Sequence, residues 1–213
     1  MLFNEWMEIV LYKKKPAELV GITLGEGIKQ LLIASVIYGI IFGIAAAILA
    51  YIDPNFGTEA PLFAIITLVL SAVAVPIISL LGMLLGGGIL HLLCMAFGGK
   101  GTYDGFVGVL AEILAAFTGT IFALLALIQV FAALGGDTAF QLVGEITSII
   151  SIITFLWGLA LYVLAAKAVH KLSLGKAIAA AAVIPVLILI IFVILMLALI
   201  IAVIASMVPE AVI

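Results

Sequence analysis

The chain has 213 residues, of which 68% are hydrophobic and only 9% are charged, and its formal net charge is −3. Soluble domains carry about 25% charged residues, so this composition excludes a soluble fold, which would lack the polar groups to cover its surface. The long apolar runs show no strand-like alternation and therefore predict an all-α, polytopic integral membrane protein, because helices satisfy their backbone hydrogen bonds internally in lipid.

Residues 1–23 are predicted to form a cytoplasmic interfacial segment that begins with an amphipathic helix lying on the membrane. The apolar residues that share one side at helical spacing are Leu2, Phe3, Trp6, Ile9 and Val10. A tryptophan suits the headgroup layer, and the lysines that follow can pair with anionic lipids. The residues expected at the lipid interface are Trp6, Lys13, Lys14 and Lys15.

Residues 24–213 are predicted to form one transmembrane domain with five spans. Thr23 followed by Glu26 has the spacing of a capping box, so a helix is expected to begin near Leu24 and to continue into the first span. A bilayer is crossed by about 20 apolar residues, and five runs reach that length. The predicted spans are residues 31–52, 62–97, 105–134, 139–170 and 177–207.

The second run is long enough to cross a bilayer twice with a break at Pro76. The charges on either side of the run argue against two crossings. Asp53 and Glu59 precede the run without any lysine, whereas Lys100 follows it, so an odd number of crossings is required between them. We therefore expect a single helix that is tilted or bent at Pro76.

The basic residues predict the orientation of the chain. All eight are lysines, and they fall in alternate breaks between the apolar runs, while the other breaks carry only acidic residues. Lysine-rich loops stay on the cytoplasmic side of a membrane. The sequence therefore predicts a cytoplasmic N-terminus and an external C-terminus. Because topology accounts for the lysines, we expect no nucleic-acid partner.

Enzyme signatures are absent from the sequence. It contains no His-Glu-x-x-His zinc motif, no Gly-x-Ser-x-Gly nucleophile motif and no phosphate-binding Gly-x-x-x-x-Gly-Lys-Ser/Thr loop. Its two histidines and single cysteine, Cys94, provide neither a metal-ligand cluster nor an intrachain disulfide. We therefore expect no catalytic residues, no metal and no cofactor.

Two polar residues within the predicted spans form a candidate site. A charge in hydrocarbon costs about 2.5–3.5 kcal/mol even on lenient scales, so such residues usually face the inside of a bundle. If the second and third spans fold antiparallel about Lys100, His91 and Glu112 lie within one helical turn of each other. The pair is interpreted either as a polar staple between two helices or as a site that responds to protons or cations.

Two pairs of glycines predict close helix packing. Gly39 and Gly43 lie four residues apart on the first span, and Gly82 and Gly86 have the same spacing on the second. Such stripes allow helices to approach closely in lipid, where association depends on packing. The contact can lie within one subunit or between the subunits of an oligomer.

The segment from Ile89 to Tyr103 resembles the Yip family (the Ypt/Rab-interacting-protein, or Yip-one, domain). It contains a helix ending in His-Leu-Leu, a Gly-Gly-Lys-Gly turn and a Thr-Tyr pair, features of the prokaryotic branch. The link from His170 to Ala177 and the opening Glu5-Trp6 are also similar to this family. The resemblance extends over essentially the whole chain and agrees with five spans.

The resemblance implies a short, prokaryotic or archaeal-type member, located in the plasma membrane of an archaeon or bacterium. Eukaryotic members associate with Rab-type GTPases, but their Asp-Leu-Tyr-Gly-Pro motif is absent here, so no such partner is expected. The resemblance also implies a non-enzymatic protein that organises membranes through contacts with lipids, with its own copies or with other membrane proteins. The alternative is a small ion, proton or solute transporter or channel that uses His91 and Glu112.

Overall fold

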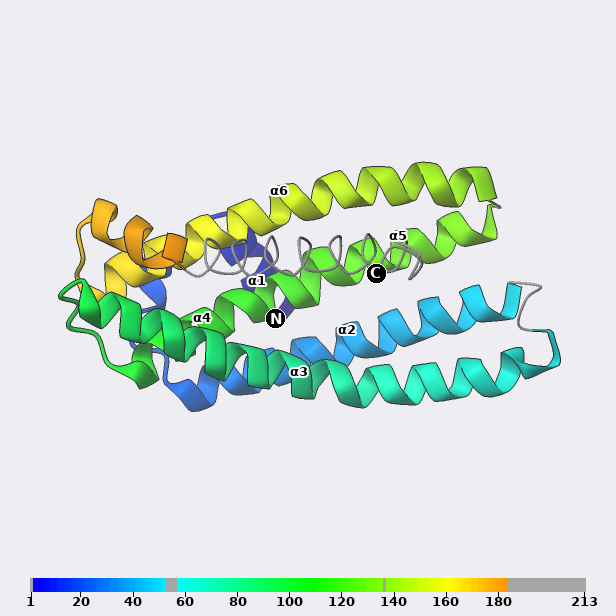
Figure 1. Ribbon diagram of the computed structural model, residues 1–213, viewed down its shortest axis with the longest axis horizontal. Coiled ribbons are helices and arrows are strands. Elements are labelled where there is room, and N and C mark those ends of the chain that lie inside the picture. Colours follow the sequence, from blue (N-terminus) through cyan, green and yellow to red (C-terminus); the bar gives the residue numbers. More distant parts are fainter. Residues whose placement is uncertain (1, 53–56, 136, 184–213) are drawn as a thin grey trace, which may run out of the picture.

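The computed structural model describes residues 2–52, 57–135 and 137–183, and within them every regular element is a helix. Long helices run side by side along the molecule (Figure 1). The main helices are α1 (Leu2–Val10), α2 (Leu24–Ile52), α3 (Ala60–Ala96), α4 (Tyr103–Phe117), α5 (Ala123–Leu134) and α6 (Asp137–His170). The shorter elements are the 3-10 turns η1 (Pro16–Leu19) and η2 (Gly57–Glu59), the π-helical turn η3 (Thr118–Phe122), and a last helix over Leu174–Val183.

Four of these helical stretches are long and apolar enough to cross a membrane, which confirms an all-α, multi-span membrane protein. They are Leu24–Tyr51, Gly57–Ala96, Tyr103–Ala132 and Ala139–His170. The predicted fifth span, residues 177–207, begins in the helix Leu174–Val183, and the rest of it lies outside the described residues.

The second span is one continuous helix, as the charges around it predict. α3 contains 37 residues with Pro76 inside it. At 1.5 Å per residue its length is about 56 Å, well beyond the hydrocarbon thickness of about 30 Å. Part of α3 therefore extends past the hydrocarbon core or is tilted within it.

A capping box sets the start of α2, as predicted. The backbone N–H of Thr23 donates to Glu26 Oε2 at 2.9 Å, and the N–H of Glu26 donates back to Thr23 Oγ1 at 3.3 Å. These bonds satisfy donors that the first turn of a helix leaves without an intrahelical partner. The helix begins at Leu24 for this local reason.

α4 lies at the centre of the described bundle, and glycines bring α2 against it. Gly27 of α2 meets the backbone of Gly108 of α4 so closely that a Cβ at Gly27 would lie 2.3 Å from the Gly108 carbonyl oxygen. Farther along α2, a Cβ at Gly39 would lie 2.7 Å from the Ser71 oxygen of α3, and one at Gly43 would lie 2.9 Å from Leu68 Cα. Gly39 and Gly43 therefore form a contact within one chain.

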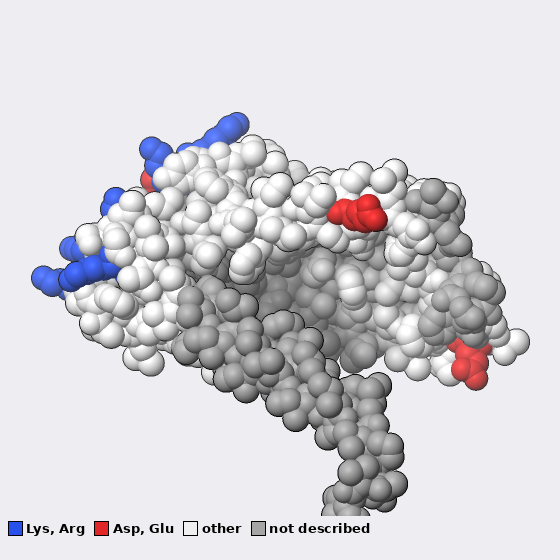
Figure 2. All heavy atoms as spheres, turned by 45° about the horizontal axis from the view of Figure 1, so that its top comes forward, with Lys and Arg blue, Asp and Glu red and all other residues white. Residues whose placement is uncertain are grey.

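The lysines gather at one end of the molecule, where α4 begins and α6 ends (Figure 2). We call this the lysine-rich end. The lysines of the chain are Lys13, Lys14, Lys15, Lys29, Lys100, Lys167, Lys171 and Lys176. This clustering is the arrangement that the alternating lysine loops require. That this end faces the cytoplasm stays a prediction.

Candidate functional site

Two histidine rings meet at the lysine-rich end. His91 Nδ1 of α3 lies 3.4 Å from His170 Nε2, at the last residue of α6. The His170 side chain is 0% exposed, and its ring contacts Phe106 of α4 edge-on at a centroid distance of 4.6 Å. The ring of Tyr103 lies 5.7 Å from that of His91. The pair therefore joins α6 to the consecutive helices α3 and α4.

The turn between α3 and α4 wraps around His170. The Gly101 N–H donates to His170 Nδ1 at 3.2 Å, and the Lys100 N–H donates to the His170 carbonyl oxygen at 3.1 Å. The turn begins with Gly98 at φ 88, a left-handed conformation that favours glycine. A Cβ at Gly99 would lie 2.8 Å from His170 Nδ1, and one at Gly101 would lie 3.0 Å from it. The Gly-Gly-Lys-Gly sequence thus lets the backbone approach the imidazole.

The structure pairs His91 with His170 and does not bring it to Glu112. His91 and Glu112 lie at similar heights along their antiparallel helices, but they lie on faces that do not meet. Phe106, which contacts both histidine rings, precedes Glu112 by six residues on α4. Six residues correspond to a rise of about 9 Å and a rotation of about 240°. Glu112 therefore lies on a different face from the histidines.

Glu112 faces α1 and α2. It follows Gly108, which contacts α2, by four residues, and its side chain is only 7% exposed. The charged groups that act on it are Lys14, Glu5 and Glu26, which come from the N-terminal segment and the start of α2. No hydrogen bond or ion pair to its carboxylate occurs within the described residues. It is a buried acid near a single cation.

The N-terminal helix α1 packs on the bundle, which differs from the prediction that its apolar side lies on lipid. Trp6 is 2% exposed, and a Cβ at Gly119 of η3 would lie 2.3 Å from its ring. The indole N–H of Trp157 in α6 donates to the Val10 carbonyl oxygen at 2.8 Å. Trp6 is thus covered by protein rather than by lipid. The sequence showed an apolar helix face but not what covers it.

The predicted lysines of this segment keep access to the surface. Lys13 and Lys15 are exposed and Lys14 is half-buried. Their contact with anionic lipids stays a prediction. A metal site is not formed in the described part of the chain, where no group of three or more His, Cys, Asp or Glu side chains is placed to hold an ion.

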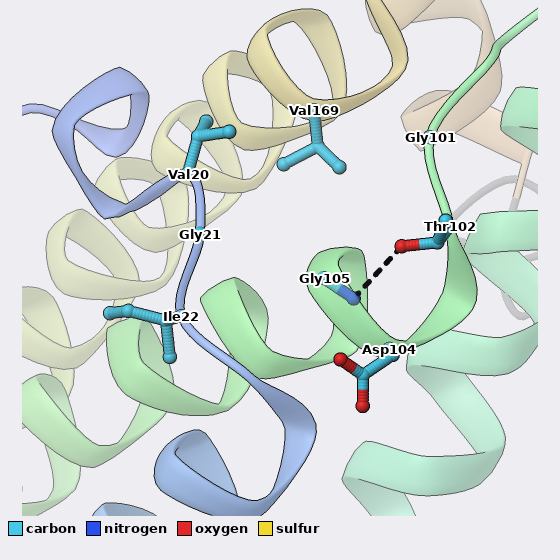
Figure 3. A pocket seen from close by; sticks show the side chains of 8 residues that line it. All are labelled: Val20, Gly21, Ile22, Gly101, Thr102, Asp104, Gly105 and Val169. Atoms are coloured by element: carbon cyan, nitrogen blue, oxygen red, sulfur yellow. Dashed lines mark hydrogen bonds between the residues drawn. The ribbon is translucent and has the colours of Figure 1, made fainter.

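A cavity of about 300 Å³ lies beside the histidine pair (Figure 3). Its lining residues are Val20, Gly21, Ile22, Gly101, Thr102, Asp104, Gly105 and Val169. Thr102 Oγ1 accepts the Gly105 N–H at 3.3 Å, and Asp104 Oδ1 accepts the Leu24 N–H at 3.2 Å. Both polar side chains are therefore engaged at the starts of α4 and α2. The cavity marks a joint between three segments.

Sequence reasoning missed His170 as the partner of His91. The available signals were its position at the end of a span and the glycine-rich turn that precedes α4. Neither identifies a partner, because the contact joins helices that are not consecutive. His91 joins two helices through His170 and not through Glu112.

A family model described as the Yip1 domain matches residues 22–197, which is most of the chain. The match contains α2, α3, α4, α5 and α6, together with His91, Glu112 and His170. No curated protein and no solved structure matches the chain. The multi-span helical fold agrees with the family match, and the protein is a membrane protein that belongs to the Yip1 domain family.

Proposed function

We propose that this protein is a non-enzymatic membrane-organising or scaffolding component that acts through contacts of its helix bundle. The observation that carries the proposal is the use of polar side chains within the spans as joints between helices. His170 contacts His91, and Gln129 Nε2 of α5 donates to Thr147 Oγ1 of α6 at 3.2 Å. Polar side chains that contact one another between helices support a structural role for this protein. Membership of the Yip1 domain family supports a non-enzymatic one.

Its contacts with other chains are proposed to use α3. Within the described residues, nothing lies within 4 Å of a Cβ placed at Gly82 or Gly86. The same helix carries large exposed apolar side chains, among them Ile78, Leu81 and Leu85. A glycine stripe on an apolar helix face suits close approach of another transmembrane helix. A second copy of the chain or another membrane protein would supply that helix.

Leucine at both Gly82 and Gly86 is expected to weaken self-association in liposomes by at least about tenfold, because the added side chains hold the partner helix away. Energy transfer between labelled copies at increasing dilution in lipid measures this. The matched control is Gly144→Leu, since Gly144 is another span glycine with nothing within 4 Å of its Cβ position. Equal association of both variants would contradict an α3 contact. Loss of monomer stability would instead place the contact within the chain, on the predicted fifth span.

A scaffold should not conduct ions. Proteoliposomes of the wild type, Glu112→Gln and His91→Ala are expected to show the same ion and proton flux as empty liposomes. The physical reason is that His91 is engaged with His170 while Glu112 lies on another face of α4, so the two do not form a shared path. pH- and potential-sensitive dyes inside the vesicles report the flux. Flux that disappears in Glu112→Gln would overturn the scaffold proposal.

The membrane in which the protein acts is proposed to be the plasma membrane of an archaeon or bacterium. Lys13, Lys14 and Lys15 would contact anionic headgroups there, each contributing about 1 kcal/mol near an anionic surface. A Rab-type GTPase is not part of the proposal. Fractionation of the source cells, with recovery of the protein in the plasma-membrane fraction, tests the location.

A further inference from the structure

We propose that His91 and His170 form a proton-sensitive latch at the lysine-rich end of the bundle. While both imidazoles are neutral, they hold the end of α3, the turn before α4 and the end of α6 together. When either ring takes up a proton, one imidazole hydrogen bond of this joint is replaced by two opposed donors, and the attachment of α6 to α3 and to the turn weakens. The Lys100 N–H bond to the His170 carbonyl oxygen does not depend on the protonation of the rings.

The hydrogen bonds fix which nitrogen of each ring carries a proton. His170 Nδ1 accepts the Gly101 N–H, so this nitrogen must be unprotonated. A neutral imidazole then carries its proton on Nε2, and this N–H points to His91 Nδ1 at 3.4 Å. His91 Nδ1 is therefore also unprotonated, and its own proton is on Nε2. The chain from Gly101 through His170 to His91 contains one donor and one acceptor at each contact.

A further proton has no position in this chain of bonds. On His170 Nδ1 it would face the Gly101 N–H across 3.2 Å, and on His91 Nδ1 it would face the Nε2–H of His170 across 3.4 Å. Each case places two donors against each other. His170 cannot turn its nitrogens to water without leaving the core, because it is fully buried against Phe106 and the turn backbone.

The surrounding charges also disfavour a protonated ring. The charged group that acts on His170 is His91 itself, and no carboxylate of the described residues acts on either ring. The titratable groups nearby are Cys94 of α3, Lys100 of the turn, Tyr103 and Asp104 of α4, Lys167 of α6, and Lys171 and Lys176 after α6. The carboxylate among them, that of Asp104, accepts the Leu24 N–H at 3.2 Å, and no hydrogen bond joins it to either imidazole. An exposed imidazole, in contrast, takes up a proton below about pH 6.5. Acid therefore favours the open joint.

Opening would change the cavity shown in Figure 3, because Gly101 and Val169 belong both to its wall and to the joint. A Cβ at Gly101 would lie only 2.8 Å from Val169 Cγ1, so the two walls are in close contact while the joint is closed. A weaker attachment of the turn to α6 would let the two walls move apart. The latch thus couples proton uptake to the shape of this face of the protein.

Cys94 provides a reporter for the joint. It is the single cysteine of the chain, it is 0% exposed, and its carbonyl oxygen accepts the Gly99 N–H of the same turn at 2.9 Å. The protection of Cys94 is defined as the labelling rate of its thiol in detergent-unfolded protein divided by the rate in the folded full-length protein in lipid nanodiscs. Both rates are measured at the same pH, so that the pH dependence of the thiol reaction cancels. We expect the protection to fall at least tenfold between pH 7.5 and pH 5, and to recover on return to pH 7.5.

The variant that tests the latch is His91→Asn/His170→Asn, because an asparagine oxygen lies near the position of Nδ1 and accepts a hydrogen bond without titrating. Its Cys94 protection is expected to be the same at pH 7.5 and pH 5. The matched control is Glu112→Gln, which removes a buried carboxyl group on another face of α4 and should retain the pH response. Persistence of the response in the asparagine variant, or its loss in Glu112→Gln, would overturn the proposal.

A second measurement uses the wild type and does not depend on the folding of a variant. The chain has two histidines, so nitrogen-15 labelling of histidine gives only two rings to assign. At pH 7.5 we expect both rings neutral, with His170 protonated at Nε2. On acidification both rings should take up protons over the same pH range in which Cys94 loses its protection. Protonation at Nδ1 of His170 at pH 7.5, or two protonated rings with Cys94 still protected, would refute the latch.

Discussion

Alanine at Gly27 is expected to lower the free energy of unfolding by about 3 kcal/mol or more. A Cβ at this position would lie 2.3 Å from the carbonyl oxygen of Gly108 and 2.9 Å from its Cα. Overpacked side chains can relax at a cost of about 1–3 kcal/mol, but here the obstacle is backbone on a neighbouring helix, so α2 and α4 themselves must separate. Denaturant or thermal unfolding in detergent micelles measures the loss.

The control for this substitution lies two residues earlier on the same helix. A Cβ at Gly25 would have nothing within 4 Å, so Gly25→Ala should leave stability unchanged or raise it by up to about 1 kcal/mol through its better helix propensity. Gly108→Ala should resemble Gly27→Ala, because its Cβ would lie 2.7 Å from the Thr23 oxygen. If Gly25→Ala and Gly27→Ala cost the same, the close crossing of α2 and α4 is wrong.

Alanine at Trp6 is expected to destabilise the protein by about 3–5 kcal/mol, the range for loss of a large buried aromatic side chain. The ring fills the space above Gly119 and anchors α1 on the π-helical turn. Without it, α1 should detach from α4 and α6. Because the chain has two tryptophans, Trp157 becomes the only one in this variant, and its fluorescence reports the loss of its bond to Val10.

Two other substitutions in α1 serve as controls for Trp6→Ala. Trp6→Phe keeps an aromatic ring above Gly119 and supplies the reference spectrum of Trp157 with α1 in place. Phe3→Ala removes an aromatic side chain of α1 that is 57% exposed, and it should cost little in detergent. If Phe3→Ala destabilises as strongly as Trp6→Ala, the packing of α1 on the bundle through Trp6 is wrong.

The candidate site could be predicted only in part from the sequence. His91 and Glu112 stand out because polar residues are rare within apolar runs, and both lie inside the described bundle. The residues that contact them cannot be identified from the sequence. His91 meets a residue 79 positions away, and Glu112 lies near charges of the N-terminal segment and of α2. These contacts depend on the rotation of each helix about its axis, which the spacing of two residues across a turn does not fix.

The sequence by itself determined the membrane-spanning helices, the start of α2 and the single helix through Pro76. These features follow from local properties: apolar length, a capping box, and backbone hydrogen bonds that close within each helix. Only the tertiary structure decided that α1 packs on protein, that Gly39 and Gly43 meet α3, and that His91 meets His170. In lipid the hydrophobic effect does not distinguish one apolar helix face from another, so side-chain packing and hydrogen bonding between non-consecutive helices select the faces that meet.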